Sequence, residues 1–220
     1  MSNISIFLSV SSKDILKAEF IRETLADCYG FDVFLFNHSL VGSQDYYKEI
    51  VTHLNSCEIF IPLLSRHFIS SSFCNQETGF ALHRQLEKET IIYPISIDGT
   101  KSYDLIDHIQ TVVCDNTDKY AELKVTTGFF NIIVSHRNFS FLQHRALEGM
   151  LRKLENTRNW KAISTIPYTL EVIKNKVTFS EKHVSILINA LKTNIAIKDR
   201  PAQRKKLSNF LKEQFSITIE

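Results

Sequence analysis

Residues 56–86 decide the fold, and they read S-C-E-I-F-I-P-L-L-S-R-H-F-I-S-S-S-F-C-N-Q-E-T-G-F-A-L-H-R-Q-L. The apolar run Ile59–Leu64 is short and lacks polar alternation, which indicates a strand covered on both faces. A serine-rich loop follows, and its hydroxyl groups are suited to cap a helix that starts near Phe73 and runs to Leu86. A buried strand followed by a helix predicts an α/β sheet.

The sequence around this stretch repeats the alternation of strand and helix. The further predicted elements are strands at 4–10, 32–36 and 91–97 and helices at 14–28 and 45–56. Four strands alternating with helices predict a flavodoxin-like, doubly wound parallel sheet with right-handed crossovers. Pro94 makes the fourth strand either an edge strand or a locally irregular one. Residues 101–130 are expected to complete the sheet with a short helix at 103–109 and a strand at 111–114.

Beyond residue 130 apolar residues recur at helical spacing. Helices are predicted at 139–155, 168–176, 179–193 and 201–215. Thr178 and Glu181 fit a capping box at the start of the third of these helices. The sequence therefore predicts an α/β domain at 1–130 and a C-terminal helical domain at 131–220, which we expect to be regulatory or oligomerising.

Charge is distributed unevenly along the chain. Residues 1–100 carry 7 Lys and Arg against 12 Asp and Glu, whereas residues 101–220 carry 19 against 12. A basic second half fits either docking on the acidic first half or contact with nucleic acid, and the sequence leaves both open.

The cysteines and the apolar segments indicate a cellular compartment. The four cysteines form no C-x-x-C pair, which speaks against common zinc and redox motifs and favours a reducing environment. The N-terminus has no basic segment before a long apolar stretch, and no run of about 18 apolar residues occurs. We therefore expect a cytoplasmic protein with no membrane partner.

Phosphate-binding motifs of the G-x-G-x-x-G and Walker types are also missing from the sequence, which argues against dinucleotide redox chemistry and nucleotide hydrolysis.

The run F-I-P-L-L-S-x-x-F-x-x-S-x-F-C-N-Q-E-x-G-x-A-L resembles the core of bacterial Toll/interleukin-receptor (TIR) domains, many of which cleave NAD+ with one glutamate in this helix. The resemblance extends to F-L-S-x-S-S-K-D at residues 7–14 and to the loop that contains Gly42. Glu77 falls on the glutamate of that family. The family's W-C-x-x-E pattern is altered, because Phe73 stands before Cys74 in place of the usual tryptophan and lacks the indole N–H.

The resemblance implies an NAD+ nucleosidase (NADase) that cleaves the bond between nicotinamide and ribose, with NAD+ as substrate and no cofactor or metal. One carboxylate suffices for this reaction, because nicotinamide leaves as a neutral base. A fixed anion at Glu77 would stabilise the positive charge that develops on the ribose. Hydrolysis to ADP-ribose and cyclisation to a cyclic ADP-ribose product both stay open. The alternative is a non-enzymatic TIR interaction or scaffold module, which has the same fold and gives Glu77 no chemical role.

Five further residues are candidate substrate contacts, each with an ordinary structural alternative. Ser9 and Ser11 follow the first strand and are placed to bond ribose or phosphate, or to cap the next helix. Phe36 and Phe73 offer rings that stack on nicotinamide or adenine, although Phe36 also fits the core. Cys74 lies near the acid, where it is either a nucleophile or a small buried residue.

The same resemblance implies partners and a setting. Self-association through TIR domains is expected, as is a phage-derived trigger or a partner defence protein in an antiphage, innate-immune role. If assembly completes each active site, the isolated protein is nearly inactive until it is triggered.

Overall fold

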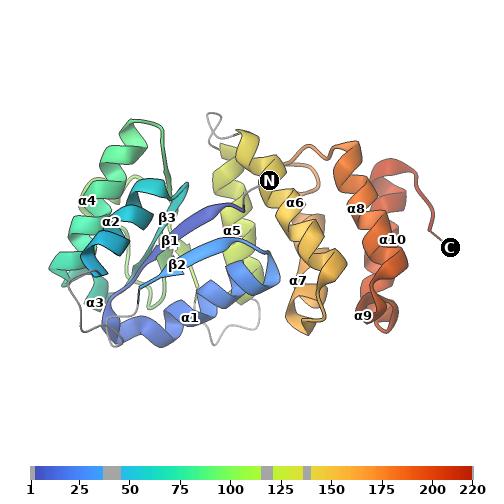
Figure 1. Cartoon of the computed structure of the whole chain (residues 1–220), viewed down its shortest axis with the longest axis horizontal. Helices are drawn as coiled ribbons and strands as arrows, with labels where there is room; N and C mark the ends of the chain where they lie inside the picture. The colour runs from blue at the N-terminus through green and yellow to red at the C-terminus, as the bar shows by residue number, and fades with distance from the viewer. Residues whose placement is uncertain (1–2, 37–45, 115–120, 136–139, 220) are drawn as a thin grey trace. The chain divides into compact units, whose positions relative to one another are not determined.

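The computed structural model describes residues 3–36, 46–114, 121–135 and 140–219, and the chain divides into two compact units. The sheet unit consists of Ile4–Glu23 and Asp32–Val125. The helical unit consists of Met1–Asn3, Thr24–Phe31 and Thr126–Glu220. Each unit is described by itself below, and Figure 1 follows the chain through both by colour. The loop around Gly42 lies outside the described residues.

The sheet is parallel throughout, and its strands lie in the order β2-β1-β3-β5-β6, with β4 paired to β3. The strands are β1 (Ser5–Ser9), β2 (Asp32–Leu35), β3 (Ile59–Leu64), β4 (Ile91–Ile92), β5 (Ile95–Ser96) and β6 (Val112–Val113). This order, with helices between the strands, confirms the predicted flavodoxin-like, doubly wound fold.

The predicted strand at 91–97 is interrupted at Pro94. Its two parts, β4 and β5, both pair with β3, at Ile59↔Ile91 and Leu63↔Ile95. Proline has no N–H to donate to the neighbouring strand, so the predicted local irregularity at Pro94 is confirmed. The other alternative, an edge strand, is wrong, because β6 pairs with β5 on its outer side.

The helices of the sheet unit follow most of the predicted spans. They are η1 (Ser12–Asp14), α1 (Ile15–Glu23), α2 (Tyr46–Ser56), α3 (Arg66–Ile69), α4 (Ser72–Leu86) and η4 (Asp104–Ile106). The predicted helix at 14–28 changes at Thr24 into the π-helix η2 (Thr24–Cys28), which belongs to the helical unit. The expected serine-rich loop contains the short helix α3, and the Ser65 hydroxyl oxygen caps it by accepting from the Phe68 N–H.

One face of the sheet carries a row of three phenylalanine rings. Phe34, Phe7 and Phe60 stand in register on β2, β1 and β3, and the centroid of Phe7 lies 5.3 Å from that of Phe34 and 5.8 Å from that of Phe60. Apolar residues of α2 and α4 pack in the same cluster, so these two helices cover this face. Figure 1 shows α1 on the other side of the strands. Burial of both sheet faces explains why the strands lack polar alternation.

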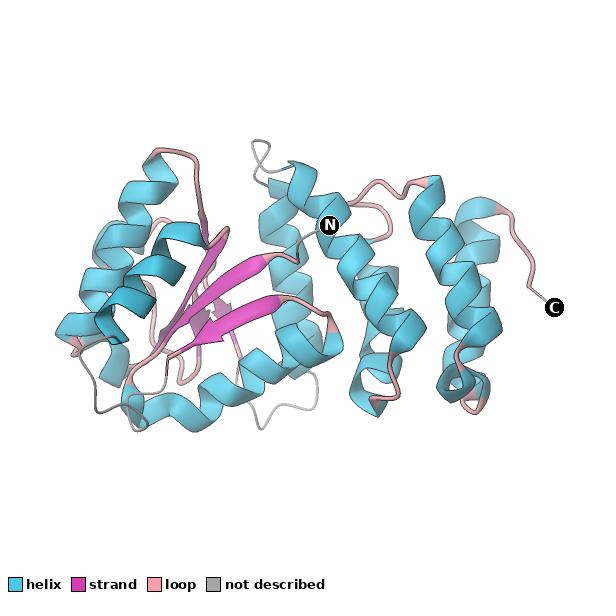
Figure 2. Cartoon of the chain, viewed as in Figure 1, coloured by secondary structure: helices cyan, strands magenta, loops and turns pink. Residues whose placement is uncertain are grey.

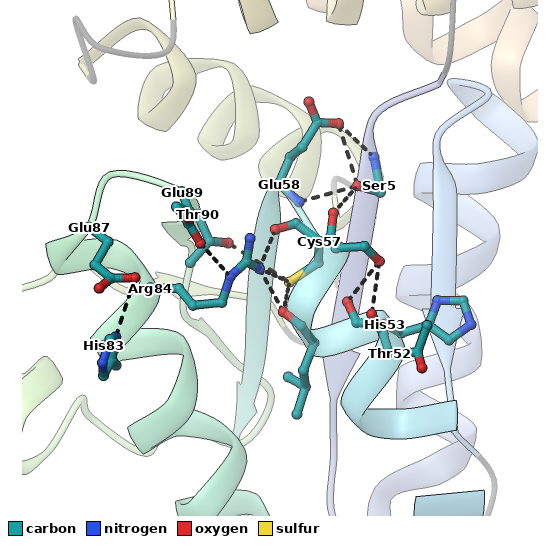
Figure 3. A network of polar contacts seen from close by, with 12 residues as sticks. Ser5, Thr52, His53, Cys57, Glu58, His83, Arg84, Glu87, Glu89 and Thr90 are labelled. Atoms are coloured by element: carbon teal, nitrogen blue, oxygen red, sulfur yellow. Dashed lines mark hydrogen bonds and ion pairs between the residues drawn. The ribbon is translucent and has the colours of Figure 1, made fainter. Parts of the chain in front are cut away.

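Arg84, near the C-terminal end of α4, ties this helix to the end of α2 (Figure 3). Its Nη1 donates to the carbonyl oxygens of Leu54 and Cys57, at 2.6 and 2.9 Å, and its Nε donates to Glu89 at 3.3 Å. The last carbonyls of a helix have no partner inside the helix. Arg84, which is only 8% exposed, supplies that partner and fixes this end of α4.

The helical unit is built of helices and loops in all its described residues (Figure 2). Its helices are α5 (Ala121–Ser135), which begins in the sheet unit, α6 (Ser140–Asn156), α7 (Trp160–Ile173), α8 (Glu181–Thr193), α9 (Ile195–Lys198) and α10 (Pro201–Phe215). The predicted C-terminal helical region is thereby confirmed. The predicted helix at 168–176 is wrong at its start, since α7 begins eight residues earlier and contains Pro167. Helix α5 was not predicted. None of the described helices is long and apolar enough to cross a membrane.

The predicted capping box at Thr178 and Glu181 is wrong by two residues. Ser180 is the N-cap of α8, and its hydroxyl oxygen accepts from the His183 N–H. The Nδ1 of His183 in turn accepts from the Ser180 N–H at 3.1 Å. The ring of His183 is buried and stacks on His144, with 5.5 Å between centroids. A neutral histidine therefore does what a glutamate usually does in this motif.

Residues 24–31 join the helical unit although they lie far from it in sequence. The hydroxyls of Tyr29 and Thr169 are hydrogen bonded at 3.2 Å. Phe31 stacks on Phe129, with 4.8 Å between ring centroids. The helical unit is thus assembled from separate segments of the chain.

Candidate active site

Helix α4 begins at a serine cap and turns Glu77 toward the sheet. The Ser71 hydroxyl oxygen accepts from the Cys74 N–H at 3.3 Å, and the helix starts at Ser72, one residue before the predicted start. Phe73 and Ala81 lie four residues on either side of Glu77, and both pack in the cluster over the sheet. Residues at this spacing share one helix face. The carboxyl group of Glu77 therefore points inward, toward the strands.

Glu77 meets the last residue of β1. The Ser9 hydroxyl donates to Glu77 Oε2 at 2.5 Å, and the two residues are 1% and 6% exposed. Burial raises the pKa of the Glu77 carboxyl to about 7, and the hydrogen bond from Ser9 offsets part of that rise. Among the described residues no cation pairs with this carboxyl. Glu77 therefore populates both its protonated and its ionised form near neutral pH.

This pair lies where the sheet reverses its order. The chain runs from β1 outward to β2 and then back across to β3, so the reversal falls between β1 and β3. In open α/β sheets, ligands bind outside the carboxyl ends of the strands at this point. Ser9 is the carboxyl-terminal residue of β1 and pairs with Pro62 of β3. Glu77, which is hydrogen bonded to Ser9, therefore lies at the sheet edge where ligands bind in folds of this kind.

A second polar contact, missed by the sequence analysis, spans the same edge. The Ser65 hydroxyl, after β3, donates to Asp14 Oδ2, in the turn after β1, at 2.6 Å. This bond ties the two loops that follow the central strands. Asp14 ends the F-L-S-x-S-S-K-D motif, so its position in that motif was the signal that could have found it.

The two buried charged residues of α4 differ in how they are satisfied. Glu77 and Arg84 are seven residues apart and so lie on one helix face, about 10 Å apart along the axis. The guanidinium of Arg84 has backbone carbonyls and a carboxylate as partners. The carboxyl group of Glu77 has one hydrogen-bond partner among the described residues, the hydroxyl of Ser9. A buried carboxylate with so little compensation costs stability, and groups of this kind cluster at functional sites.

Cys74 hydrogen bonds to Ser9 of this pair, whereas Ser11 lies two residues after Ser9 along the chain. Burial raises the pKa of the Cys74 thiol to about 11, and the nearby Glu77 also raises it. A thiol with this pKa is protonated at neutral pH and is a poor nucleophile. Ser11 is buried before η1, and its hydroxyl makes no capping hydrogen bond to that helix.

Phe36 and Phe73 are placed together against the core. Both are partly buried and pack on the cluster that contains the phenylalanine row of the sheet. The Phe36 ring lies 6.5 Å from that of Phe34, centroid to centroid. The structure thus brings Ser9 and Glu77 into direct contact and places these two rings in apolar packing beside the cluster.

A small pocket of about 140 Å³ opens beside α4, but on its other side. Its lining includes Asn75, Thr78 and Gly79, and Glu77 is not part of it. Residues 75, 78 and 79 lie more than a quarter turn from Glu77 on the helix. We therefore place the candidate site at the Ser9–Glu77 pair and not at this pocket.

Together these features define a class: a flavodoxin-like α/β domain with a buried carboxylate at the point of strand reversal. A family model of the TIR domain matches residues 6–125, which is more than half of the chain. The chain therefore belongs to the TIR domain family, whose members include NAD-cleaving enzymes and scaffold proteins. No curated protein matches the chain.

Proposed function

We propose that this protein cleaves NAD+ at the bond between nicotinamide and ribose, with Glu77 as the catalytic carboxylate. The observation that carries the proposal is the buried carboxyl of Glu77, which is hydrogen bonded to Ser9 at the carboxyl end of β1 in a TIR domain and pairs with no cation among the described residues. A scaffold would gain nothing from this arrangement, because replacing the acid by an uncharged residue would remove a cost to stability.

The proposed cleavage of NAD+ requires few protein groups. The C–N bond breaks, its electron pair leaves with neutral nicotinamide, and positive charge develops on the ribose. An ionised carboxylate in a site of low dielectric stabilises that charge strongly. Ser9 would hold the carboxyl in place while substrate binds. In hydrolysis a water oxygen then bonds to the ribose carbon and releases a proton. In cyclisation a nitrogen or oxygen of the same ADP-ribose replaces the water.

The ionised form of Glu77 is the active one in this scheme. Because burial raises the pKa of Glu77 to about 7, activity should rise with pH through neutrality and level off above it. An ordinary exposed glutamate would be fully ionised well below that range.

We further propose that assembly regulates the site, in an antiphage role in which a phage-derived trigger or a partner defence protein promotes self-association through the TIR domain. In the single chain only 6% of Glu77 is exposed, so a substrate gains little access to it. Specific activity should therefore rise with protein concentration. A dilute monomer that turns over NAD+ at its full rate would contradict this part of the proposal.

The experiment measures nicotinamide release from NAD+ by the full chain, at low and high protein concentration and with a crowding agent, with products separated by chromatography. Three proteins are compared: wild type, Glu77→Gln, and Glu49→Gln as a matched control. Glu49 is an exposed glutamate of α2. Nicotinamide should appear with wild type and the control and not with Glu77→Gln. The second product then separates hydrolysis from cyclisation.

If wild type and Glu77→Gln release nicotinamide equally, or neither releases it under any assembling condition, the proposal fails. In the second case the non-enzymatic TIR module becomes the better description. Ser9→Ala adds a finer test, because it removes only the hydrogen bond to the carboxyl. It should lower turnover and raise the pH of half-maximal activity, since that hydrogen bond lowers the pKa of Glu77.

A further inference from the structure

The helical unit carries most of the positive charge of the chain. Residues 126–220 contain 16 Lys and Arg against 7 Asp and Glu, a net charge of +9, in a protein whose total is +2. Several of the acids are already neutralised within the unit: Glu148 pairs with Arg152 and Lys182, and Glu171 pairs with Lys174. A unit with this imbalance attracts polyanions.

Helices α7 and α10 lie side by side and run in the same direction. The Lys206 ammonium of α10 stands 4.2 Å from the ring centroid of Tyr168 on α7. Further along, Lys174, just after α7, reaches Glu213 of α10 at 3.5 Å. The two contacts are six residues apart on one helix and seven on the other. Helix α9 also contacts α7.

Two aromatic rings are exposed on α7. Trp160 is 59% exposed and Tyr168 is 46% exposed. They are eight residues apart, which separates them by about 12 Å along the helix axis. Ser164 lies between the two rings and interrupts the apolar face, while Val172, which is 39% exposed, lies four residues beyond Tyr168. Lipid insertion and apolar helix docking favour a continuous apolar stripe instead.

Lys206 lies over the Tyr168 ring, and further basic residues are next to Trp160 in sequence or on α9 and the N-cap of α10, helices that contact α7. We call the set the basic–aromatic surface, and it comprises Trp160, Lys161, Tyr168, Lys198, Arg200 and Lys206. Asp199 is the acidic residue next to it in sequence. We propose that this surface binds single-stranded nucleic acid, with bases stacking on Trp160 and Tyr168 and phosphates meeting the basic side chains. Exposed rings in a positive field are how proteins hold single strands without reading their sequence.

This proposal is independent of NAD+ cleavage, because it concerns the other unit and uses none of its residues.

Trp160 makes the test specific to the site, since it is the single tryptophan of the chain. The full-length protein is titrated with oligothymidylate and with oligouridylate, and tryptophan fluorescence is recorded at several salt concentrations. Stacking on Trp160 should quench its emission. Affinity should fall steeply with salt, with a log–log slope of about −0.7 for each phosphate contact. Dextran sulfate, which has charge but no bases, should compete at low salt and not quench.

Three variants keep Trp160 as the reporter. Tyr168→Ala should weaken binding by about 5- to 150-fold, as expected for one lost stacking partner. Lys206→Glu should weaken binding and reduce the salt slope by roughly 1. Lys192→Glu is the matched control, because Lys192 is an exposed lysine of α8 outside the basic–aromatic surface. Circular dichroism verifies that each variant is folded.

The proposal fails if dextran sulfate quenches the tryptophan emission as much as oligonucleotides do, or if no binding occurs at low salt. It also fails if Lys206→Glu and Lys192→Glu have equal effects on binding. Quenching by anionic phospholipid vesicles in place of oligonucleotides would overturn it as well. A tryptophan signal that changes only with protein concentration would assign the surface to contacts between copies of this chain, which also overturns it.

Discussion

Replacing Glu77 by glutamine should stabilise the folded protein while it abolishes NAD+ cleavage. The pKa of this carboxyl is raised by burial from its ordinary value of 4.5 to about 7. One pKa unit corresponds to about 1.4 kcal/mol, so the ionised carboxylate costs the folded state about 3 kcal/mol. The folded state holds the proton more tightly than the unfolded state, so this cost appears as pH rises from about 4.5 through 7. Glutamine has no proton to lose and avoids it.

The assay is urea unfolding of wild type and Glu77→Gln, followed by far-UV circular dichroism across a range of pH. Tryptophan fluorescence is unsuitable, because Trp160 lies in the helical unit. All other titrating groups are shared, so their effects cancel in the difference between the two proteins. The advantage of the glutamine variant should grow by about 2.5 kcal/mol between about pH 5 and about pH 8. Glu49→Gln should show no such growth.

A stability difference that does not change with pH would refute the argument, because the cost would then not come from ionisation of Glu77. A Glu77→Gln variant that is less stable than wild type at about pH 8 would refute it more directly. That result would mean that the carboxylate has a stabilising partner and is a structural residue.

Three further predictions concern residues other than Glu77. Arg84→Ala should lower the free energy of unfolding by about 3 kcal/mol, because it removes the guanidinium donor from the buried carbonyls of Leu54 and Cys57; Arg22→Ala, in a surface ion pair, should cost under about 1 kcal/mol in the same urea titration. Burial lowers the pKa of His183, so its protonation opposes folding, and thermal stability should fall as pH drops below about 6.5; His183→Gln should flatten that dependence, and an unchanged slope would contradict this assignment. All four cysteines are buried thiols outside disulfides, so a thiol reagent should label none of them quickly in the native protein and four after unfolding; fast labelling of any one would contradict its burial.

The fold could be predicted well wherever a strand or helix is long and its pattern is unmixed. The run Ile59–Leu64 became β3 with the predicted bounds, and α10 occupies the predicted span 201–215. Prediction failed where local signals were short or ambiguous. Helix α3 has four residues, too few for a period to show. The predicted helix at 168–176 begins directly after Pro167, yet Pro167 lies inside α7, among the buried apolar residues of that helix.

Contacts between distant residues could not be predicted. That Glu77 meets Ser9, 68 residues away, depends on how α4 crosses the sheet, and sequence spacing carries no such information. The resemblance pointed to Glu77 and the position after the first strand pointed to Ser9, and the structure supplies their hydrogen bond. The recruitment of Thr24–Phe31 into the helical unit is of the same kind, because its apolar residues suit either core equally well.

Helix α4 separates the residue that anchors it from the residue proposed to do chemistry. Arg84 holds one end through backbone carbonyls, and Ser71 caps the other, so neither attachment depends on Glu77. A chain without the acid should therefore keep the surfaces of the native chain and still take its place among wild-type copies. In any assembly whose active sites work together, such a chain would act as a dominant inhibitor, because it lowers the number of active sites while the assembly stays intact.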